Sequence, residues 1–368
     1  MTRSVMTTFL LSALLALCCL NGGANARALR ADVAATSGDG CSDAQKAELA
    51  AAAVPDEYST DGSDELVVWG TALNYSGGQV KAYTKFAAGS DGSPECEGGP
   101  SAVGVEVDDT VLSSLPGPAD VSVQPPPVCM TDPSTPGCFT PFDQLWLNWL
   151  EGDLASLNPF PVMELNWEPL GHALQNVYSV PHFDFHFYLV PEAAVMNVTA
   201  GPCLGLSPEA FYAANQPIPE ACFPGGKWAN MMAVAPYMGN HYLNGDAPEI
   251  KAAFAGENGV AAWNVTFIYG GYDGQLTYME PMIKRSFLMS KPDECWSIPD
   301  SPSEWAIAGY KPATYCVLST DTGVRVELRD FTWYDAGCMG DQPIANASLP
   351  MADPSAPPLP PECELPMA

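Results

Sequence analysis

Basic residues are scarce in this chain. Its 368 residues include 14 lysines and arginines against 43 aspartates and glutamates, which gives a formal net charge of −29. Such a charge repels phosphate backbones and anionic head groups, so we expect no nucleic-acid partner. The acidity is typical of a solvated surface that keeps a protein in solution, and cation storage is the alternative.

Long apolar runs are lacking beyond the first residues. An apolar run over residues 4–20 follows the basic start at Arg3 and precedes Ala24-Asn25-Ala26, the small-residue pattern of a signal peptidase site. We therefore expect a signal peptide over residues 1–26, a mature chain that begins near Arg27, secretion, and no membrane anchor.

The sequence also lacks several catalytic motifs. It contains no Gly-x-Ser-x-Gly elbow, no His-Glu-x-x-His, no phosphate-binding loop and no Gly-x-Gly-x-x-Gly that opens a helix. A cysteine nucleophile is not expected either, because cysteines of exported proteins are normally oxidised. The catalytic residues, if the protein is an enzyme, are not identified by motif.

Cysteines are even in number once the leader is removed. Two of the 12 cysteines lie in the leader, so ten remain, enough for five disulfides. Short loops favour Cys129–Cys138, Cys203–Cys222 and Cys295–Cys316. Four Asn-x-Ser/Thr sequons predict a glycoprotein, and they begin at Asn74, Asn197, Asn264 and Asn346.

Alternating and β-branched segments dominate the chain. We therefore predict a mainly β fold, an antiparallel sandwich or barrel with a few short helices. Glycine-rich turns predict three hairpins: 65–75 with 79–86, 263–269 with 275–283, and 314–319 with 324–332. Short helices are predicted over 43–53, 208–214 and 248–255, and a further amphipathic helix is predicted after the N-cap Thr140.

Composition divides the chain into six parts. The segments rich in Ala, Gly, Ser or Pro read as arms and linkers, and the aromatic, β-branched segments read as folded units. The predicted parts are a signal peptide (1–26), a flexible arm (27–64), a small β-unit (65–125), a linker with the amphipathic helix (126–160), a main β-rich domain (161–340) and a Pro-rich tail (341–368).

All four histidines lie between residues 172 and 241. The segment Pro181–Tyr188 alternates so strictly that a strand places His182, Asp184 and His186 on one face and three phenylalanines on the other. Residues four apart on a strand are separated by about 13 Å, too far to share an ion, whereas same-face neighbours at about 7 Å can converge on one. A metal site would therefore combine part of this triplet with other segments.

Three further residues complete the set of candidate ligands. His172 and His241 each follow a glycine-containing turn, and Glu280 interrupts a predicted apolar strand, where a carboxylate needs a cation or a hydrogen-bond donor. Imidazole and carboxylate together suit a transition metal such as Zn, Mn, Fe, Ni or Cu. The candidate metal ligands are His172, His182, Asp184, His186, His241 and Glu280.

Two alternatives to a metal site stay open. The cluster could be a structural hydrogen-bond network, or a metal-free acid–base site in which a histidine works with Asp184.

Four blocks of the sequence occur in a familiar order and spacing: Leu165–His172, Pro181–Tyr188, Pro236–Tyr242 and Phe267–Met282. Together they resemble an exported domain family of unknown function, known mainly from bacteria as the TTHB-like domain. The resemblance covers roughly residues 65–288 and implies an exported β-rich domain whose signature includes the six candidate ligands. The chain departs from the family in its cysteine framework, in the segment of about 139–160, and in Ala173-Leu174 after the histidine.

Three functions are compatible with these features. The favoured one is a secreted protein of unknown biochemical role with a His/carboxylate metal site. It would be either a metalloenzyme of hydrolase or lyase type, with an open coordination position, or a non-catalytic metal-binding protein with a closed shell. The alternative is a structural or small-molecule-binding module without metal. The sequence leaves the oligomeric state open.

The charge balance generates the first prediction. The protein should not bind DNA or heparin with measurable affinity at physiological salt. Its 43 acidic residues repel these polyanions, and its 14 basic residues are too few to offset the repulsion. Fluorescence anisotropy with labelled DNA and heparin checks this. Tight binding that weakens steeply with salt would contradict it.

Overall fold

The computed structural model describes residues 41–56, 65–96, 98–118, 143–147, 152–172, 174, 176–338 and 363. Antiparallel strands dominate these residues, which confirms the predicted mainly β fold with a few short helices. No helix among the described residues is long and apolar enough to cross a membrane.

One sheet, sheet A, joins early and late parts of the chain. β6 pairs along its whole length with β19, so the predicted boundary near residue 125 does not separate two sheets. In sheet order, its main strands are β1 (Val54–Pro55), β2 (Glu65–Trp69), β4 (Gly78–Ala88), β6 (Ala102–Asp108), β19 (Gly323–Arg329), β18 (Thr314–Ser319) and β16 (Glu294–Ser297). Two short strands, β3 (Leu73–Tyr75) and β5 (Pro94–Glu95), also pair with β4.

The other large sheet, sheet B, contains the histidine-bearing strand. That strand is β9, which lies between β15 and β8. In sheet order, the strands are β12 (Trp228–Ala235), β13 (Gly239–Asn244), β14 (Val265–Tyr272), β15 (Gln275–Lys284), β9 (His182–Tyr188), β8 (Val162–Glu168) and β7 (Asp143–Leu147).

Short elements complete the described chain. Two minor sheets are formed by β10 (Ala200–Gly201) with β11 (Gly205–Leu206), and by β17 (Gly309–Lys311) with β20 (Thr332–Tyr334). The helices are α2 (Asp43–Ala52), α3 (Asp109–Ser114), α4 (Glu192–Val195), α5 (Pro208–Ala214), α6 (Pro248–Phe254) and α7 (Arg285–Leu288), with 3₁₀ turns η2 (Gly152–Leu157), η3 (Glu220–Cys222) and η4 (Gly259–Ala262).

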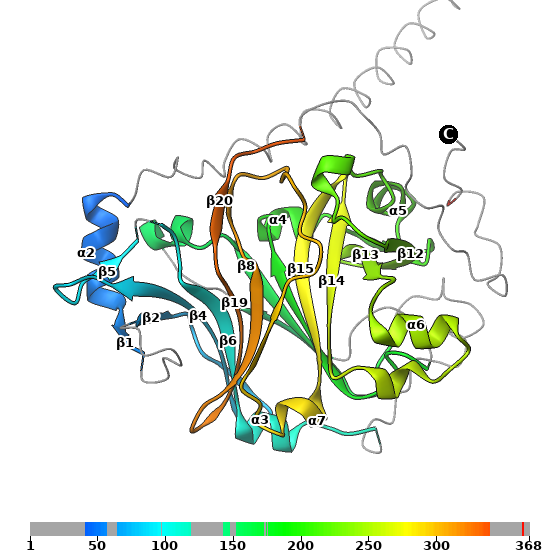
Figure 1. Ribbon diagram of the computed structural model, residues 1–368, viewed down its shortest axis with the longest axis horizontal. Helices are drawn as coiled ribbons and strands as arrows, with labels where there is room; N and C mark the ends of the chain where they lie inside the picture. Colours follow the sequence, from blue (N-terminus) through cyan, green and yellow to red (C-terminus); the bar gives the residue numbers. More distant parts are fainter. Residues whose placement is uncertain are drawn as a thin grey trace, which may run out of the picture. The chain divides into compact units, whose positions relative to one another are not determined.

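The two large sheets pack face to face over one apolar core. In Figure 1, the cyan β4 and β6 with the orange β19 lie opposite the green and yellow strands β8, β15 and β14. The rings of Phe267 on β14 and Tyr315 on β18 lie 5.1 Å apart across the interface. On β9, Phe183, Phe185 and Phe187 point into this core, so the alternating polar residues must lie on the outer face of sheet B.

Most predicted local elements are present. The three hairpins form β3–β4, β14–β15 and β18–β19, and helices occur at the three predicted ranges apart from differences at the ends. Helix α2 begins with a capping box between Ser42 and Gln45. Its Leu49 is fully buried, so this part of the predicted arm is packed on the fold.

The predicted amphipathic helix after Thr140 is wrong for the residues described there. Asp143–Leu147 forms the edge strand β7, which pairs with β8 in register, Gln144 opposite Asn166 and Trp146 opposite Glu164. The apolar spacing fits both a helix and a strand over so few residues, and pairing with β8 decides the outcome. Thr140 and Pro141 lie outside the described residues.

The structure pairs eight cysteines into four disulfides. Cys295–Cys316 is confirmed, and it joins directly opposed residues of β16 and β18. The predicted Cys203–Cys222 pair is wrong, because long-range packing brings other partners closer than chain proximity does. The observed pairs are Cys41–Cys96, Cys203–Cys363, Cys222–Cys338 and Cys295–Cys316. The predicted Cys129–Cys138 pair lies outside the described residues.

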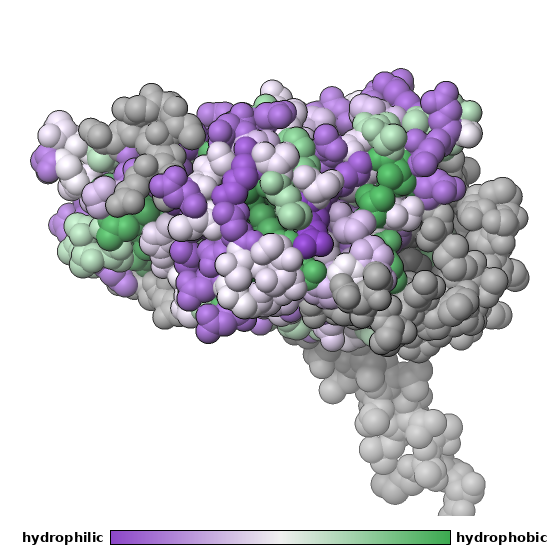
Figure 2. Space-filling view, turned by 90° about the horizontal axis from the view of Figure 1, so that it is seen from below, coloured by the Kyte–Doolittle hydropathy of each residue, from purple (hydrophilic) through white to green (hydrophobic). Residues whose placement is uncertain are grey.

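The exposed surface is largely hydrophilic where it can be seen. On the face drawn in Figure 2, apolar residues occur in small separate areas between hydrophilic ones. The large exposed apolar side chains are few among the described residues: Val54, Met196, Tyr212, Phe254 and Met289. Scattered residues of this kind are normal for a soluble surface and do not define a docking site.

The disulfide arrangement generates a second prediction. Proteolytic mapping of unreduced protein should recover a Cys203–Cys363 peptide and a Cys222–Cys338 peptide, because their Cα atoms lie 5.4 and 5.9 Å apart, within disulfide range. Mass spectrometry before and after reduction checks the assignment. A dominant Cys203–Cys222 peptide would contradict the fold in this region.

Candidate metal centres

The outer face of sheet B carries a buried polar row. On β9, His182, Asp184 and His186 occupy this face, as the alternation predicts, and all three are almost fully buried. The neighbouring strand β8 alternates in the same way and adds Glu164 and Asn166, which pair in register with His186 and Asp184. Apolar clusters flank the row. One contains Trp263, Ile268 and Met282 and the other contains Tyr188, Tyr278 and Met238.

The six predicted ligands fall into two groups of three, where the sequence led us to expect a single ion. Group 1 contains His172, His182 and Asp184, and group 2 contains His186, His241 and Glu280. Within each group the ligand atoms lie within 4.8 Å of one another. As the strand geometry requires, His182 and His186 do not share a group.

Group 1 is compact. The Nε2 atom of His182 lies 3.0 Å from Nε2 of His172 and 3.1 Å from Oδ1 of Asp184. The Nε2 atom of His172 lies 3.4 Å from Oδ2 of Asp184. In a tetrahedral site with metal–ligand bonds of about 2.0–2.1 Å, ligand atoms lie about 3.3 Å apart. The three separations therefore match the edges of a coordination shell.

His172 reaches the group from a tight loop after β8. Gly171 adopts a positive φ of 68°, and a Cβ there would lie 1.9 Å from the carbonyl oxygen of Tyr178, so only glycine fits. The indole of Trp263 donates to the carbonyl of Val177 at 2.8 Å and anchors the returning loop. The His172 side chain is 36% exposed, so group 1 is open to solvent on that side.

Group 2 is wider and more deeply buried. Oε2 of Glu280 lies 3.5 Å from Nε2 of His186 and 3.9 Å from Nε2 of His241. His241 lies in strand β13, just after the turn at residues 236–238, as the sequence predicted. Its cross-strand partner Gly270 has no Cβ, which leaves room for the Tyr278 ring beside the two imidazoles, 5.0 Å from that of His186 and 5.5 Å from that of His241.

Backbone carbonyls fix one histidine tautomer in each group. Nδ1 of His182 lies 2.7 Å from the carbonyl oxygen of Val180, and Nδ1 of His241 lies 2.7 Å from that of Ala233. A carbonyl oxygen only accepts, so each Nδ1 must carry the proton. When these rings are neutral, their Nε2 lone pairs point towards the carboxylates, an arrangement typical of metal-ligating histidines.

Burial and charge shift the pKa values of these groups in different directions. In group 1, burial opposes ionisation of Asp184. Charge interactions and hydrogen bonds with His182 and His172 outweigh this effect of burial and hold the pKa of Asp184 below its usual range. In group 2, burial lowers the pKa of His186 to about 3 and that of His241 to about 4. Burial, reinforced by Asp184 and Glu164, raises the pKa of Glu280 well above its usual value.

Sequence reasoning missed Glu164. Burial raises the pKa of this carboxyl to about 8. Gln144 of β7 donates to its Oε1 at 2.6 Å, and the Tyr188 hydroxyl donates to its Oε2 at 2.8 Å. The alternation Glu164, Asn166, Glu168 along β8 is the signal that could have found it.

Sheet A also buries carboxylates on its outer face, but supplies them with cations. Lys85 contacts Asp56, Glu65 and Glu327 at 2.9–3.5 Å. The other ion pairs of this face are Lys81–Glu106, Arg325–Asp56, Arg325–Glu106, Arg329–Glu65 and Arg329–Glu327. The described strands of sheet B contain one lysine and no arginine. This residue, Lys284, donates from its ammonium group to the carbonyl of Val260.

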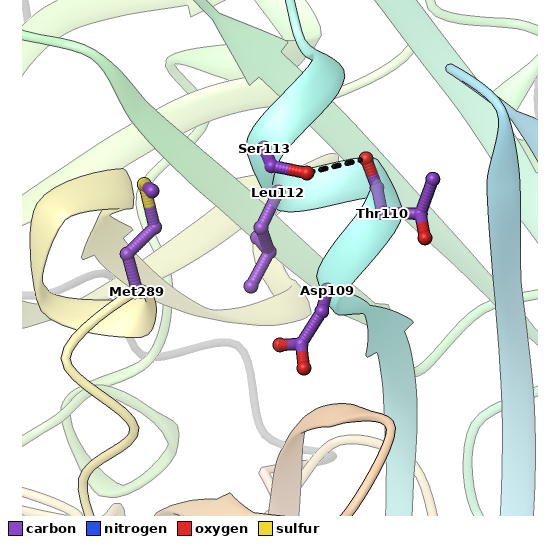
Figure 3. Close-up of a pocket in the computed structure, with 5 residues that line it drawn as sticks. All are labelled: Asp109, Thr110, Leu112, Ser113 and Met289. Atoms are coloured by element: carbon purple, nitrogen blue, oxygen red, sulfur yellow. Dashed lines mark hydrogen bonds between the residues drawn. The ribbon is translucent and has the colours of Figure 1, made fainter.

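A separate pocket lies between α3 and the residue after α7. It has a volume of about 300 Å³ and is lined by Asp109, Thr110, Leu112, Ser113 and Met289. Figure 3 shows the Ser113 hydroxyl turned back to the carbonyl of Thr110. The Asp109 carboxylate is paired with Lys291 at 2.6 Å. The pocket contains none of the six candidate ligands, so it offers no comparable metal chemistry.

No protein-family model, curated protein or solved structure matches the chain. The resemblance to the TTHB-like domain therefore stays a prediction.

The burial of Glu164 generates a third prediction. Because its folded pKa is raised to about 8, the stability that the neutral carboxyl provides is present below pH 4.5 and is lost as the pH rises towards 8. In chelator-treated protein, Glu164→Gln should therefore melt above wild type, by a margin that grows between pH 5 and pH 8.

Thermal denaturation monitored by circular dichroism measures this margin. The control is Glu106→Gln, which removes a carboxylate paired with Lys81 and Arg325 and should lower the melting temperature at neutral pH. A Glu164→Gln protein that is less stable than wild type at pH 8 would contradict the prediction.

Proposed function

We propose that this chain is a secreted metalloprotein that holds a transition-metal ion between His172, His182 and Asp184. The observation that carries the proposal is the set of separations between the three ligand atoms, 3.0, 3.1 and 3.4 Å. Two imidazole nitrogens and a carboxylate oxygen are a donor set used by zinc and by non-haem iron proteins. Manganese, nickel and copper also accept it.

Hydrogen bonding alone accounts poorly for group 1. With the proton of His182 on Nδ1, its Nε2 faces both Asp184 and His172 with a lone pair. Oδ1 of Asp184 is buried and receives no hydrogen bond among the described residues. Without a metal, His172 with its proton on Nε2 can donate to Nε2 of His182, but the lone pair of His182 still faces Oδ1 of Asp184 at 3.1 Å. A cation between the three atoms converts that contact into ligand bonds, whereas the metal-free alternative needs an additional proton between His182 and Asp184.

The partial exposure of His172 favours an ion with a free coordination position. Three protein ligands leave at least one position of a tetrahedral ion for water, and a bound transition metal lowers the pKa of that water. This observation supports the second candidate function, a metalloenzyme of hydrolase or lyase type. The role of His172, His182 and Asp184 themselves in such an enzyme would be to hold the ion in position.

The proposal that the protein is secreted is supported by other features of the chain. The apolar leader with its small-residue cleavage pattern, the four sequons and the four disulfides all support passage through an oxidising secretory compartment. Disulfides also explain why histidine and carboxylate, rather than thiolate, supply the ligands.

Metal analysis tests the proposal, and is the fourth prediction. Protein purified without added metal should contain Zn, Mn, Fe, Ni or Cu, and His172→Ala and Asp184→Asn should each lose one equivalent per chain. His172 lies on a partly exposed loop and Asn is nearly isosteric with Asp, so both variants should fold. Inductively coupled plasma mass spectrometry gives the metal content.

The matched control is Asp56→Asn, which removes a buried carboxylate that is paired with Lys85 and Arg325. It should lower stability and leave the metal content unchanged. If His172→Ala and Asp184→Asn retain the full wild-type content, group 1 is not the metal site.

A further inference from the structure

We infer that group 2, formed by His186, His241 and Glu280, is a second metal site, separate from group 1 and slower to exchange its ion. This inference does not rest on the proposed function, because it uses different residues and different contacts. The site would hold a single divalent transition-metal ion, coordinated by two imidazoles and one carboxylate.

The first argument is the isolation of Glu280. Its side chain is 1% exposed, and its Oε2 receives no hydrogen bond among the described residues. No lysine or arginine of the described chain forms an ion pair with it, whereas every buried carboxylate of the sheet A network has such a partner. A carboxyl oxygen buried without a hydrogen-bond partner costs free energy, which a coordinated cation would offset.

The second argument is the orientation of the two imidazoles. The Ala233 carbonyl holds the proton of His241 on Nδ1, so the Nε2 lone pair is directed at the space shared with Glu280. Neither ring nitrogen of His186 has a hydrogen-bond partner among the described residues, although the side chain is 1% exposed. Two ligand-ready nitrogens and one orphaned oxygen thus converge from strands β13, β9 and β15.

The third argument is that the backbone is shaped around this point. A β-bulge in β12 between Asn230 and Ala233 brings the Ala233 carbonyl opposite His241. The pairing of β15 with β9 skips residues 280 and 281, where Pro281 has no N–H to donate. The bulge lies beside His241, and bulges are commonly found next to functional sites.

The two sites should differ in exchange rate because they differ in access. The least buried ligand of group 2 is His241, with a side-chain exposure of 15%, against 36% for His172 in group 1. The rings of Tyr278 and Tyr188 also pack against His186, with centroids 5.0 and 6.0 Å from that of the imidazole. Release of an ion from group 2 should therefore require local opening of sheet B.

The test measures how many zinc ions the full-length folded chain binds and how fast each is released. Wild type equilibrated with Zn²⁺ should bind two equivalents, and EDTA should release them in a fast and a slow phase. His172→Ala should abolish only the fast phase. His241→Ala and Glu280→Gln should each abolish only the slow phase, with at least a tenfold rise in the release rate of any zinc that remains at group 2.

The control for a buried carboxylate is Glu327→Gln, which removes a partner of Lys85 and Arg329 and should keep both phases. Circular dichroism verifies folding, and if His241→Ala does not fold, the nearly isosteric Glu280→Gln decides. The inference is overturned if wild type binds one equivalent that Glu280→Gln retains. Loss of zinc only in Glu280→Gln, with His172→Ala unchanged, would support group 2 and overturn the proposed function instead.

Discussion

Everything about the candidate centres depends on how buried carboxylates are neutralised. Among the described residues, the lysines and arginines that pair with buried carboxylates lie in and beside sheet A rather than in sheet B. Sheet A uses its basic residues in this way, and Lys85 alone contacts three carboxylates. On the outer face of sheet B, the residues beside the buried carboxyl groups are histidines. A metal ion held by imidazole and carboxylate would give sheet B the positive charge that the guanidinium and ammonium groups give sheet A.

The same strand provides both the core and the site. Because β9 alternates, Phe183, Phe185 and Phe187 fix the strand in the sandwich, and their burial determines where His182, Asp184 and His186 lie. A register shift of one residue would exchange the two faces, so the stability of the core and the geometry of the ligands are coupled. The candidate ligands on β9 are thus held by rigid structure, whereas His172 is held by a loop that only a glycine at position 171 permits.

The sequence predicted the positions of the candidate ligands better than it predicted the chain topology. Strict alternation around His182 and the carboxyl of Glu280 in an apolar strand are local signals, and both residues are buried on the strands that those signals indicate. The division into two groups could not be predicted, because it depends on which strands flank β9. The pairing of β6 with β19, the strand β7 and the partner of Cys203 are long-range choices with no local signal. Glu164 was overlooked although β8 shows the same alternation as β9.

The most direct test of the central claim is anomalous X-ray diffraction from crystals of protein purified without added metal, with data collected on both sides of the absorption edge of the bound element. The account predicts an anomalous peak about 2.0–2.2 Å from Nε2 of His172, Nε2 of His182 and an Asp184 oxygen. A structure without such a peak, in which His182 donates a hydrogen bond from Nε2 to Asp184, would contradict it.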